Sequence, residues 1–258
     1  MDLEALLKKD YVQGIVAEGK RIDGRGFDER RPITVTKGFA AEKAPGSARI
    51  NLGGTDIIVG ISMGLGEPYS DSPEDGVMTT STEFRPIADP NFELGPPRED
   101  SIEVARVIDR GIRESGAIDT GKLLIEEGKI WMVFIDIHIL NNAGNLFDAG
   151  GIAAIAALLD ARMPKYEDGN VIRGEWDGKL PITCTPIPLT IAKIAGNLVA
   201  DPCLDEEYGL DARLTVTTTD TVNAMQKGGT GSLTIEEVEA AVDMAFAKSE
   251  EVRKLVEK

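Results

Sequence analysis

Three arginines, Arg106, Arg110 and Arg113, have the residue type and spacing that most clearly suggest chemistry. Steps of four and three residues place them on one stripe of a helix. Guanidinium groups are planar, permanently charged and matched in shape to phosphate oxygens, so this stripe could bind a nucleic-acid backbone. The chain as a whole is acidic, with 28 Lys+Arg against 44 Asp+Glu and a formal net charge of -16. That balance argues against binding nucleic acid over a broad basic surface but permits a local basic path.

The helix that must position these arginines is predicted within residues 96–115. Asp100 is expected to cap its start, with Glu103 completing a capping box. The opposite face has the spacing of a core-facing stripe, formed by Val104, Val107, Ile108 and Ile112. The residues also allow a simpler alternative, a solvated face on which the arginines pair weakly with the acids Glu99, Glu103 and Asp109.

A second candidate site is the acidic segment 201–211, which contains Asp201, Asp205, Glu206, Glu207 and Asp211. Clustered carboxylates can hold Mg²⁺ or activate a nucleophile. The more common arrangement of such a segment is a solvated loop. A further charged segment, residues 21–33, interleaves arginines with acids around Gly24 and Gly26, and we predict a surface loop that pairs with itself.

The clearest strand is predicted over residues 129–140, where apolar residues alternate. One face carries Val133, Ile135, Ile137 and Ile139. Asp136 and His138 share the other face, where we expect a structural hydrogen-bonded pair, with catalysis as the alternative.

Several classes of site and location are disfavoured by composition. His138 is the single histidine, and Cys184 and Cys203, the two cysteines, fit no zinc or redox spacing. We therefore expect no metal site and no cofactor. The chain has 42% hydrophobic and 28% charged residues, no apolar run of membrane-spanning length and no secretory pattern, so we expect a cytoplasmic globular protein.

The remaining periodicity predicts an α+β fold in which two similar halves of mixed sheet pack with helices. A first helix is predicted over residues 2–17, with a stripe formed by Leu3, Leu6, Leu7 and Tyr11. An Ala-rich helix should follow a turn at Gly150–Gly151 and stop at Pro164. A last helix should be capped by Thr234 and Glu237, with a stripe formed by Ile235, Val238, Val242 and Ala245.

We expect one compact unit with three parts. Residues 1–30 would form the N-terminal helix and charged loop, residues 31–165 the first half, and residues 166–258 the second half. The polar, Gly-rich segment 166–180 would mark the boundary between the halves.

In this order the motifs resemble the RNase PH family of phosphorolytic exoribonucleases, over nearly the whole chain. The resemblance rests on RIDGR followed by RRPI, on GSARINLGGTDIIVG, on the arginine helix, on the strand WMVFIDIHIL, on DAGG before the Ala-rich helix, and on LVADPCLDEE. The first of these motifs is the most specific. Within the family, the likeness is greatest to the non-catalytic RNase PH-like subunit of the archaeal exosome core.

The resemblance implies a reaction in which inorganic phosphate attacks the 3′-terminal phosphodiester of RNA and releases a nucleoside diphosphate. Active members hold the phosphate in a Gly-Thr/Ser-Arg-Ser/Thr turn at a helix start. We expect the corresponding residues here to be Gly150, Gly151, Ile152 and Ala153. Ile152 would then replace the arginine, and both hydroxyls would be lost, so no catalytic residue is expected.

The role implied is a non-catalytic subunit that alternates with a catalytic RNase PH-like exosome subunit in a ring of three heterodimers. RNA-binding cap proteins and single-stranded RNA would be its other partners, with the RNA contacted by Arg106, Arg110 and Arg113. One alternative is an active homo-oligomeric exoribonuclease that uses Asp201 and Glu207, the pair of acids at the spacing found in active members. Another is a free-standing α+β protein with no RNA role.

Overall fold

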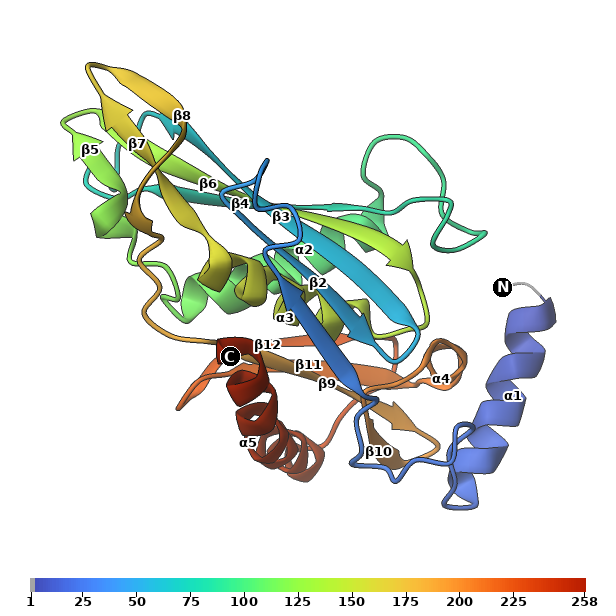
Figure 1. The fold of residues 1–258 in the computed structure, drawn as a ribbon. Coiled ribbons are helices and arrows are strands. Elements are labelled where there is room, and N and C mark those ends of the chain that lie inside the picture. The colour runs from blue at the N-terminus through green and yellow to red at the C-terminus, as the bar shows by residue number, and fades with distance from the viewer. Residues whose placement is uncertain (1–2) are drawn as a thin grey trace.

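The first sheet is organised around β6 (Lys129–Asn141), which confirms the strand predicted there. The computed structural model describes residues 3–258, and within them the strand order is β1-β2-β3-β6-β4, with β5 also paired to β6 (Figure 1). All pairs are antiparallel except that of β4 with β6. The partner strands are β1 (Ile33–Lys37), β2 (Gly46–Leu52), β3 (Thr55–Gly66), β4 (Val77–Glu83) and β5 (Leu124–Glu126).

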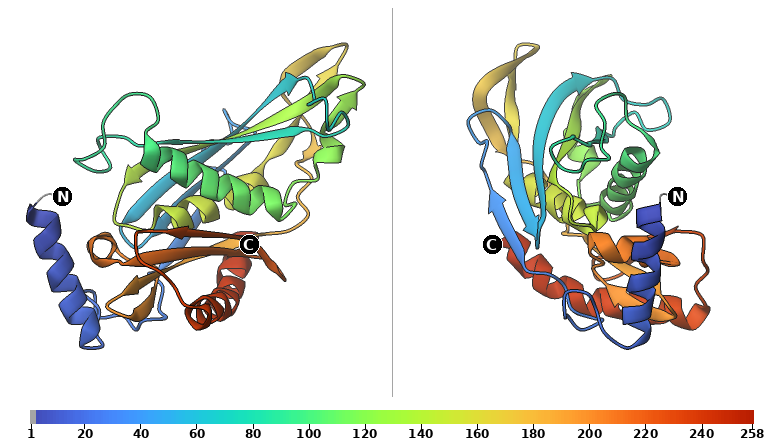
Figure 2. Two further views of the ribbon diagram at one scale, coloured as in Figure 1. Left: turned by 180° about the vertical axis from the view of Figure 1, so that it is seen from behind. Right: turned by 90° about the vertical axis from the view of Figure 1, so that its right-hand side faces the viewer.

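Two helices cover the apolar face of this sheet. The predicted inward residues of β6 are fully buried, namely Val133, Ile135, Ile137 and Ile139. They belong to the same core as α2 (Glu99–Glu114) and α3 (Leu146–Asp160). Figure 2 shows α2 running along this face, between the first sheet and the second. α3 is rich in alanine and glycine, which lets its backbone approach both sheets closely.

The second sheet has the order β10-β9-β11-β12 in the described residues. All of its pairs are antiparallel, whereas a mixed sheet was predicted for this half. Its strands are β9 (Ile187–Ile194), β10 (Asn197–Ala200), β11 (Ala212–Thr218) and β12 (Val222–Gly228). α5 (Ile235–Glu257) packs against it, and Thr234 and Glu237 form the predicted capping box. Of the predicted stripe of α5, Ala245 is buried and Val238 and Val242 pack against the core, whereas Ile235 is exposed. The buried face continues along the helix through Ala241, Ser249, Val252 and Val256.

The segment expected to be a boundary loop forms a hairpin of β7 (Arg162–Glu167) and β8 (Asn170–Lys179). Pro164 lies inside β7, so α3 already ends at Asp160. A short 3₁₀ helix, η1 (Thr120–Leu123), leads into β5.

The N-terminal helix α1 (Leu3–Ala17) lies at one edge of the molecule beside α4 (Leu204–Gly209) (Figure 1). Its position along the chain agrees with the helix predicted over residues 2–17. Asp2 and the side chains of Leu3 and Leu6 lie outside the described part of the chain. The predicted inward face is wrong, because Leu7 and Tyr11 are exposed while Val12 and Val16 are buried. None of the helices in the described residues is both long and apolar enough to cross a membrane.

Candidate nucleic-acid interface

The arginine helix α2 buries one face and exposes the other, as its periodicity predicted. Val104, Val107, Ile108 and Ile112 are buried, whereas Arg106, Arg110 and Arg113 are exposed. The predicted cap at Asp100 is wrong: the helix begins at Glu99, after Arg98, and no side chain caps it. Glu99 and Asp100 instead lie in the first turn, where a negative charge interacts favourably with the helix dipole.

The three arginines differ in how firmly they are held. Arg113 donates to both carboxylate oxygens of Asp109, at 2.9 and 3.0 Å, and to the carbonyl oxygen of Met78 at 2.9 Å. Arg110 donates to the carbonyl oxygen of Met225 at 3.0 Å and to Oε1 of Gln226 at 2.5 Å, both on β12. Arg106 makes no hydrogen bond or ion pair with any described residue, so its guanidinium is free to bind a ligand.

All three arginines line one open groove with a volume of about 800 Å³. Its other walls are the start of β4, the side chain of Tyr69 and Gln226 of β12. Four carboxylates also line it. Asp109 is paired with Arg113 and Glu103 with Arg213 at 2.5 Å, whereas Glu99 and Glu114 form no ion pair within the described residues. The free guanidinium of Arg106 therefore lines a groove in which two of the four acids are neutralised by arginines. The solvated ion-pair alternative describes Arg113 but not Arg106.

The acidic segment 201–211 is not a solvated loop. Residues 204–209 form α4, and the side chains of Asp201 and Glu206 are fully buried. Glu206 accepts hydrogen bonds from Arg21, Nε to Oε1 at 2.8 Å and Nη2 to Oε2 at 2.7 Å. Arg25 donates to Asp201 at 3.0 Å. The prediction that the charged loop 21–33 pairs with itself is therefore largely wrong. The loop pairs mainly with this distant segment.

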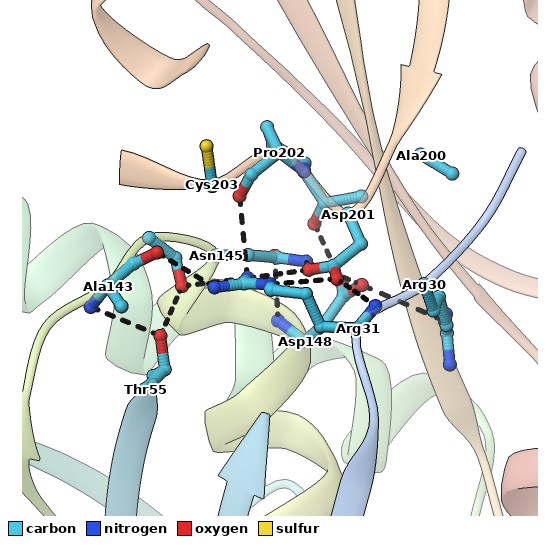
Figure 3. A network of polar contacts seen from close by, with 12 residues as sticks. Arg30, Arg31, Thr55, Ala143, Asn145, Asp148, Ala200, Asp201, Pro202 and Cys203 are labelled. Atoms are coloured by element: carbon cyan, nitrogen blue, oxygen red, sulfur yellow. Dashed lines mark hydrogen bonds and ion pairs between the residues drawn. The ribbon is translucent and has the colours of Figure 1, made fainter. Parts of the chain in front are cut away.

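Asp201 is the centre of this buried network (Figure 3). Arg31 reaches it with Nη2 to Oδ1 at 2.7 Å and Nε to Oδ2 at 2.9 Å, and the backbone N–H of Arg31 adds a bond of 2.8 Å. Asn145 donates to Oδ1 at 2.7 Å. Burial alone would raise the pKa of Asp201, but the hydrogen bonds and charge of Arg31 outweigh it and lower the pKa. The guanidinium groups thus occupy the positions around the Asp201 carboxylate at which a metal cation would bind. No cluster of side chains suited to a metal ion is found in residues 3–258.

The predicted phosphate turn at residues 150–153 is wrong. α3 begins at Leu146, so these residues lie inside the helix and are buried. A Cβ atom added to Gly150 would lie 2.6 Å from Cδ1 of Ile108, and one added to Gly151 would lie 2.7 Å from Cγ of Pro188. The glycines therefore serve close packing. Ile152 is a core residue and not a replacement for a ligand.

The true helix start reads Gly144, Asn145, Leu146, Phe147 and Asp148. It carries neither an arginine nor a hydroxyl. The side chain of Asn145 caps the helix by accepting from the backbone N–H of Asp148. Phe147 packs against Arg213, whose guanidinium carbon lies 4.4 Å from the ring centroid. Asp148 is buried and accepts from Thr190 at 2.8 Å and from Asn145 at 2.9 Å.

Glu207 places its carboxyl group at this helix start. Its Oε1 accepts from the backbone N–H of Asn145 at 2.8 Å. Burial of the carboxylate raises the pKa of Glu207 to about 7, although the residue as a whole is only half-buried. Burial also raises the pKa of Asp148, against the opposing charge of Arg30. Two carboxyl groups of the protein thus occupy the place where a helix start could bind an anion.

Asp136 and His138 do share a face of β6, but each contacts β4. The Ser81 hydroxyl donates to Asp136 at 2.8 Å, and Nδ1 of His138 lies 3.5 Å from Glu83. They do not form the predicted pair with one another.

Sequence reasoning missed Tyr69 and Gln226 as groove residues. Both belong to segments far from α2 in the chain, so only the fold brings them to it.

Comparison with known proteins gives the family. A family model described as the 3′ exoribonuclease family, domain 1, matches residues 29–164, and its domain 2 matches residues 184–248. The chain belongs to the RNase PH, or 3′ exoribonuclease, family. The exosome complex component Rrp42 of Thermococcus gammatolerans is 49% identical over 263 residues, covering 99% of this chain and 96% of that protein. The Rrp42 of Pyrococcus horikoshii is 51% identical over 262 residues, with 99% and 95% covered.

Solved structures of this family have the same fold as the chain. A chain of the Archaeoglobus fulgidus exosome with RNA bound to the active site superposes with a TM-score of 0.91 at 44% identity, covering 98% of this chain and 99% of that one. A chain of an archaeal exosome core gives 0.88 at 40% identity, with 99% and 98% covered. Rice Rrp46, with a TM-score of 0.69 at 18% identity, shares the fold alone. The RNase PH-like fold that the resemblance implied is confirmed.

Proposed function

We propose that this chain is a non-catalytic subunit of an archaeal exosome, a phosphorolytic complex that degrades RNA from the 3′ end. In this proposal it alternates with a catalytic RNase PH-like subunit in a ring of three heterodimers, to which RNA-binding cap proteins attach. Support comes from relatives named as exosome components and from the similarity to a chain of an RNA-bound exosome.

The observation that carries the non-catalytic assignment is the start of α3. Phosphorolysis needs a site for inorganic phosphate, built from donors and positive charge. Here Glu207 accepts the hydrogen bond from the backbone N–H of Asn145, and Asp148 lies one turn away. The ring of Phe147 packs over the guanidinium of Arg213. A phosphate dianion would meet two carboxyl groups in place of positive charge, and few free donors. Asp201 would also be a poor catalytic acid, because Arg31 and Arg25 already bind it.

We assign the groove along α2 to the RNA backbone. Arg106 and Arg110 would contact phosphates, since Arg106 is free and the exposed side chain of Arg110 is held in place by β12. Arg113 would add positive charge at the end of the groove while Asp109 and Met78 keep it in place. Contacts of this kind hold RNA in register without reading its sequence.

Phosphate-dependent release of nucleoside diphosphates from single-stranded RNA tests the assignment. We expect no release by the purified chain and sustained release once the catalytic RNase PH-like partner is added. The matched control is the partner by itself, which separates its own activity from that of the assembled ring. Phosphate-dependent release by this chain alone would overturn the assignment in favour of an active homo-oligomer.

A further inference from the structure

We propose that Tyr69 forms a stacking site for one nucleobase of single-stranded RNA, in the groove that the arginines of α2 line. This rests on the proposed function, and it adds a binding site for a base to the binding of the phosphates.

Tyr69 is an exposed aromatic residue on a firmly anchored loop. Its side chain lines the same groove as Arg106, Arg110 and Arg113, and the residue is 63% exposed. Its carbonyl oxygen accepts from the N–H of Ser72 at 3.1 Å, which closes a turn in the β3–β4 loop. The end of that loop is held by Gly76, whose N–H donates to the carbonyl oxygen of Thr120 at 2.9 Å.

The groove wall near Tyr69 is also held in place from the side of α2. Arg113 donates to the carbonyl oxygen of Met78 on β4 at 2.9 Å. The hydrogen bonds that Arg113 donates to Asp109 chiefly raise the pKa of Arg113, and Tyr69 is close enough to add a smaller electrostatic effect. The phenol hydroxyl of Tyr69 forms no hydrogen bond with the rest of the described chain. The ring is therefore neither packed in the core nor tied down by its hydroxyl.

The surrounding chemistry favours a nucleobase as the ligand of this ring. Proteins that hold single strands without sequence preference combine arginines along the backbone with aromatic rings that stack on bases. From Arg106 to Arg113 the helix rises roughly 10 Å, enough for a short run of nucleotides. A strand whose phosphates follow α2 would bring a base within the same groove to Tyr69, the only aromatic residue that lines it in the described part of the chain.

The test uses the ring assembled with its catalytic partner in phosphate-free buffer, so that RNA binds without being degraded. Single-stranded RNAs carrying 2-aminopurine at successive positions from the 3′ end report stacking by fluorescence quenching. We expect Tyr69→Ala to weaken RNA binding about tenfold and to relieve quenching at one position, while Tyr69→Phe retains both. Tyr11→Ala is the matched control, because Tyr11 is an equally exposed tyrosine, on α1, outside the groove.

Three results would overturn the stacking site. Tyr69→Ala could bind RNA as the unchanged ring does, Tyr69→Phe could lose as much affinity as Tyr69→Ala, or Tyr69→Ala could prevent ring assembly in size-exclusion chromatography. The last would make Tyr69 a contact between subunits. A ring with Arg106→Ala and Arg110→Ala separates the two proposals in the same titration. If it binds weakly while Tyr69→Ala binds normally, only the stacking site fails; if both bind normally, the groove is not the RNA site.

Discussion

Arg31 and Asp201 lie 170 residues apart in the chain and form a bidentate ion pair, with N–O distances of 2.7 and 2.9 Å. The pair joins the loop before β1 to the turn between β10 and α4. Arg25 and Asn145 donate to the same carboxylate, so one buried acid ties three distant segments together. The charge that the family resemblance associates with catalysis therefore holds the fold together in this chain.

Asp201→Ala should destabilise the protein by about 3–5 kcal/mol, because it leaves the buried guanidinium of Arg31 without its ion-pair partner. Chemical denaturation followed by circular dichroism measures the change. Asp205→Ala is the control, since Asp205 is half-exposed and meets only Lys8 at 3.6 Å among the ion pairs found, so its loss should cost less than about 0.5 kcal/mol. Equal stability of the two variants would show that the buried pair contributes little.

Glu207→Gln should flatten the pH dependence of stability between about pH 5 and pH 8. The folded-state pKa of Glu207 is about 7, above its ordinary value of 4.5, so the folded state binds the proton more tightly. The resulting stability is complete below the ordinary pKa and is lost as pH rises through 7, by at most about 3 kcal/mol and by less to the extent that water reaches the carboxylate.

Glutamine retains an acceptor for the N–H of Asn145 and cannot ionise. The variant should therefore resemble the parent protein near pH 5 and exceed its free energy of unfolding at pH 8. Thermal and chemical unfolding across this range, with the exposed Glu18→Gln as control, gives the comparison. Parallel curves for Glu207→Gln and the parent would refute the buried-carboxylate explanation.

Gly144→Ala should destabilise the junction of α3 and α4 by more than about 2 kcal/mol. Gly144 has φ of 89°, and an added Cβ would lie 2.4 Å from the backbone nitrogen of Leu204. Gly14→Ala is the matched substitution, because nothing lies within 4 Å of its added Cβ and it sits inside α1. We expect that variant to gain roughly 0.5–1 kcal/mol from the higher helix propensity of alanine. The unfolding midpoints of both variants, compared with that of the parent protein, test this expectation. An unchanged stability of Gly144→Ala would show that the junction can relax.

The elements with strong local periodicity could be predicted from the sequence. β6 alternates apolar residues along its length, and α2 repeats them at helical spacing, so Val133 and Val104 were correctly assigned to the core. The face of α1 could not be predicted in this way. Its packing partners are α4 and β9, and they bury Val12 and Val16 while the larger Leu7 and Tyr11 remain exposed.

The site was only partly predictable for a related reason. Gly150 and Gly151 suggested a turn because glycine usually breaks helices, but here they admit Ile108 and Pro188 into close contact with α3. The pairing of Arg31 with Asp201 could not be read from a chain with many charges of both signs. The exposed arginine stripe was predictable, whereas the selective restraint of Arg110 and Arg113 depends on β12 and β4.

The salt dependence of RNA binding by the assembled ring tests the role of the arginine groove most directly. Affinity for a single-stranded RNA would be measured over a series of salt concentrations in phosphate-free buffer, for the parent ring and for one with Arg106→Ala and Arg110→Ala. Lys122→Ala, which removes an exposed cation outside the groove, is the control. We predict weaker binding by the double variant and a log–log slope smaller in magnitude by about 1.4, or about 0.7 for each lost phosphate contact. An unchanged affinity and slope would contradict the assignment of this groove to RNA.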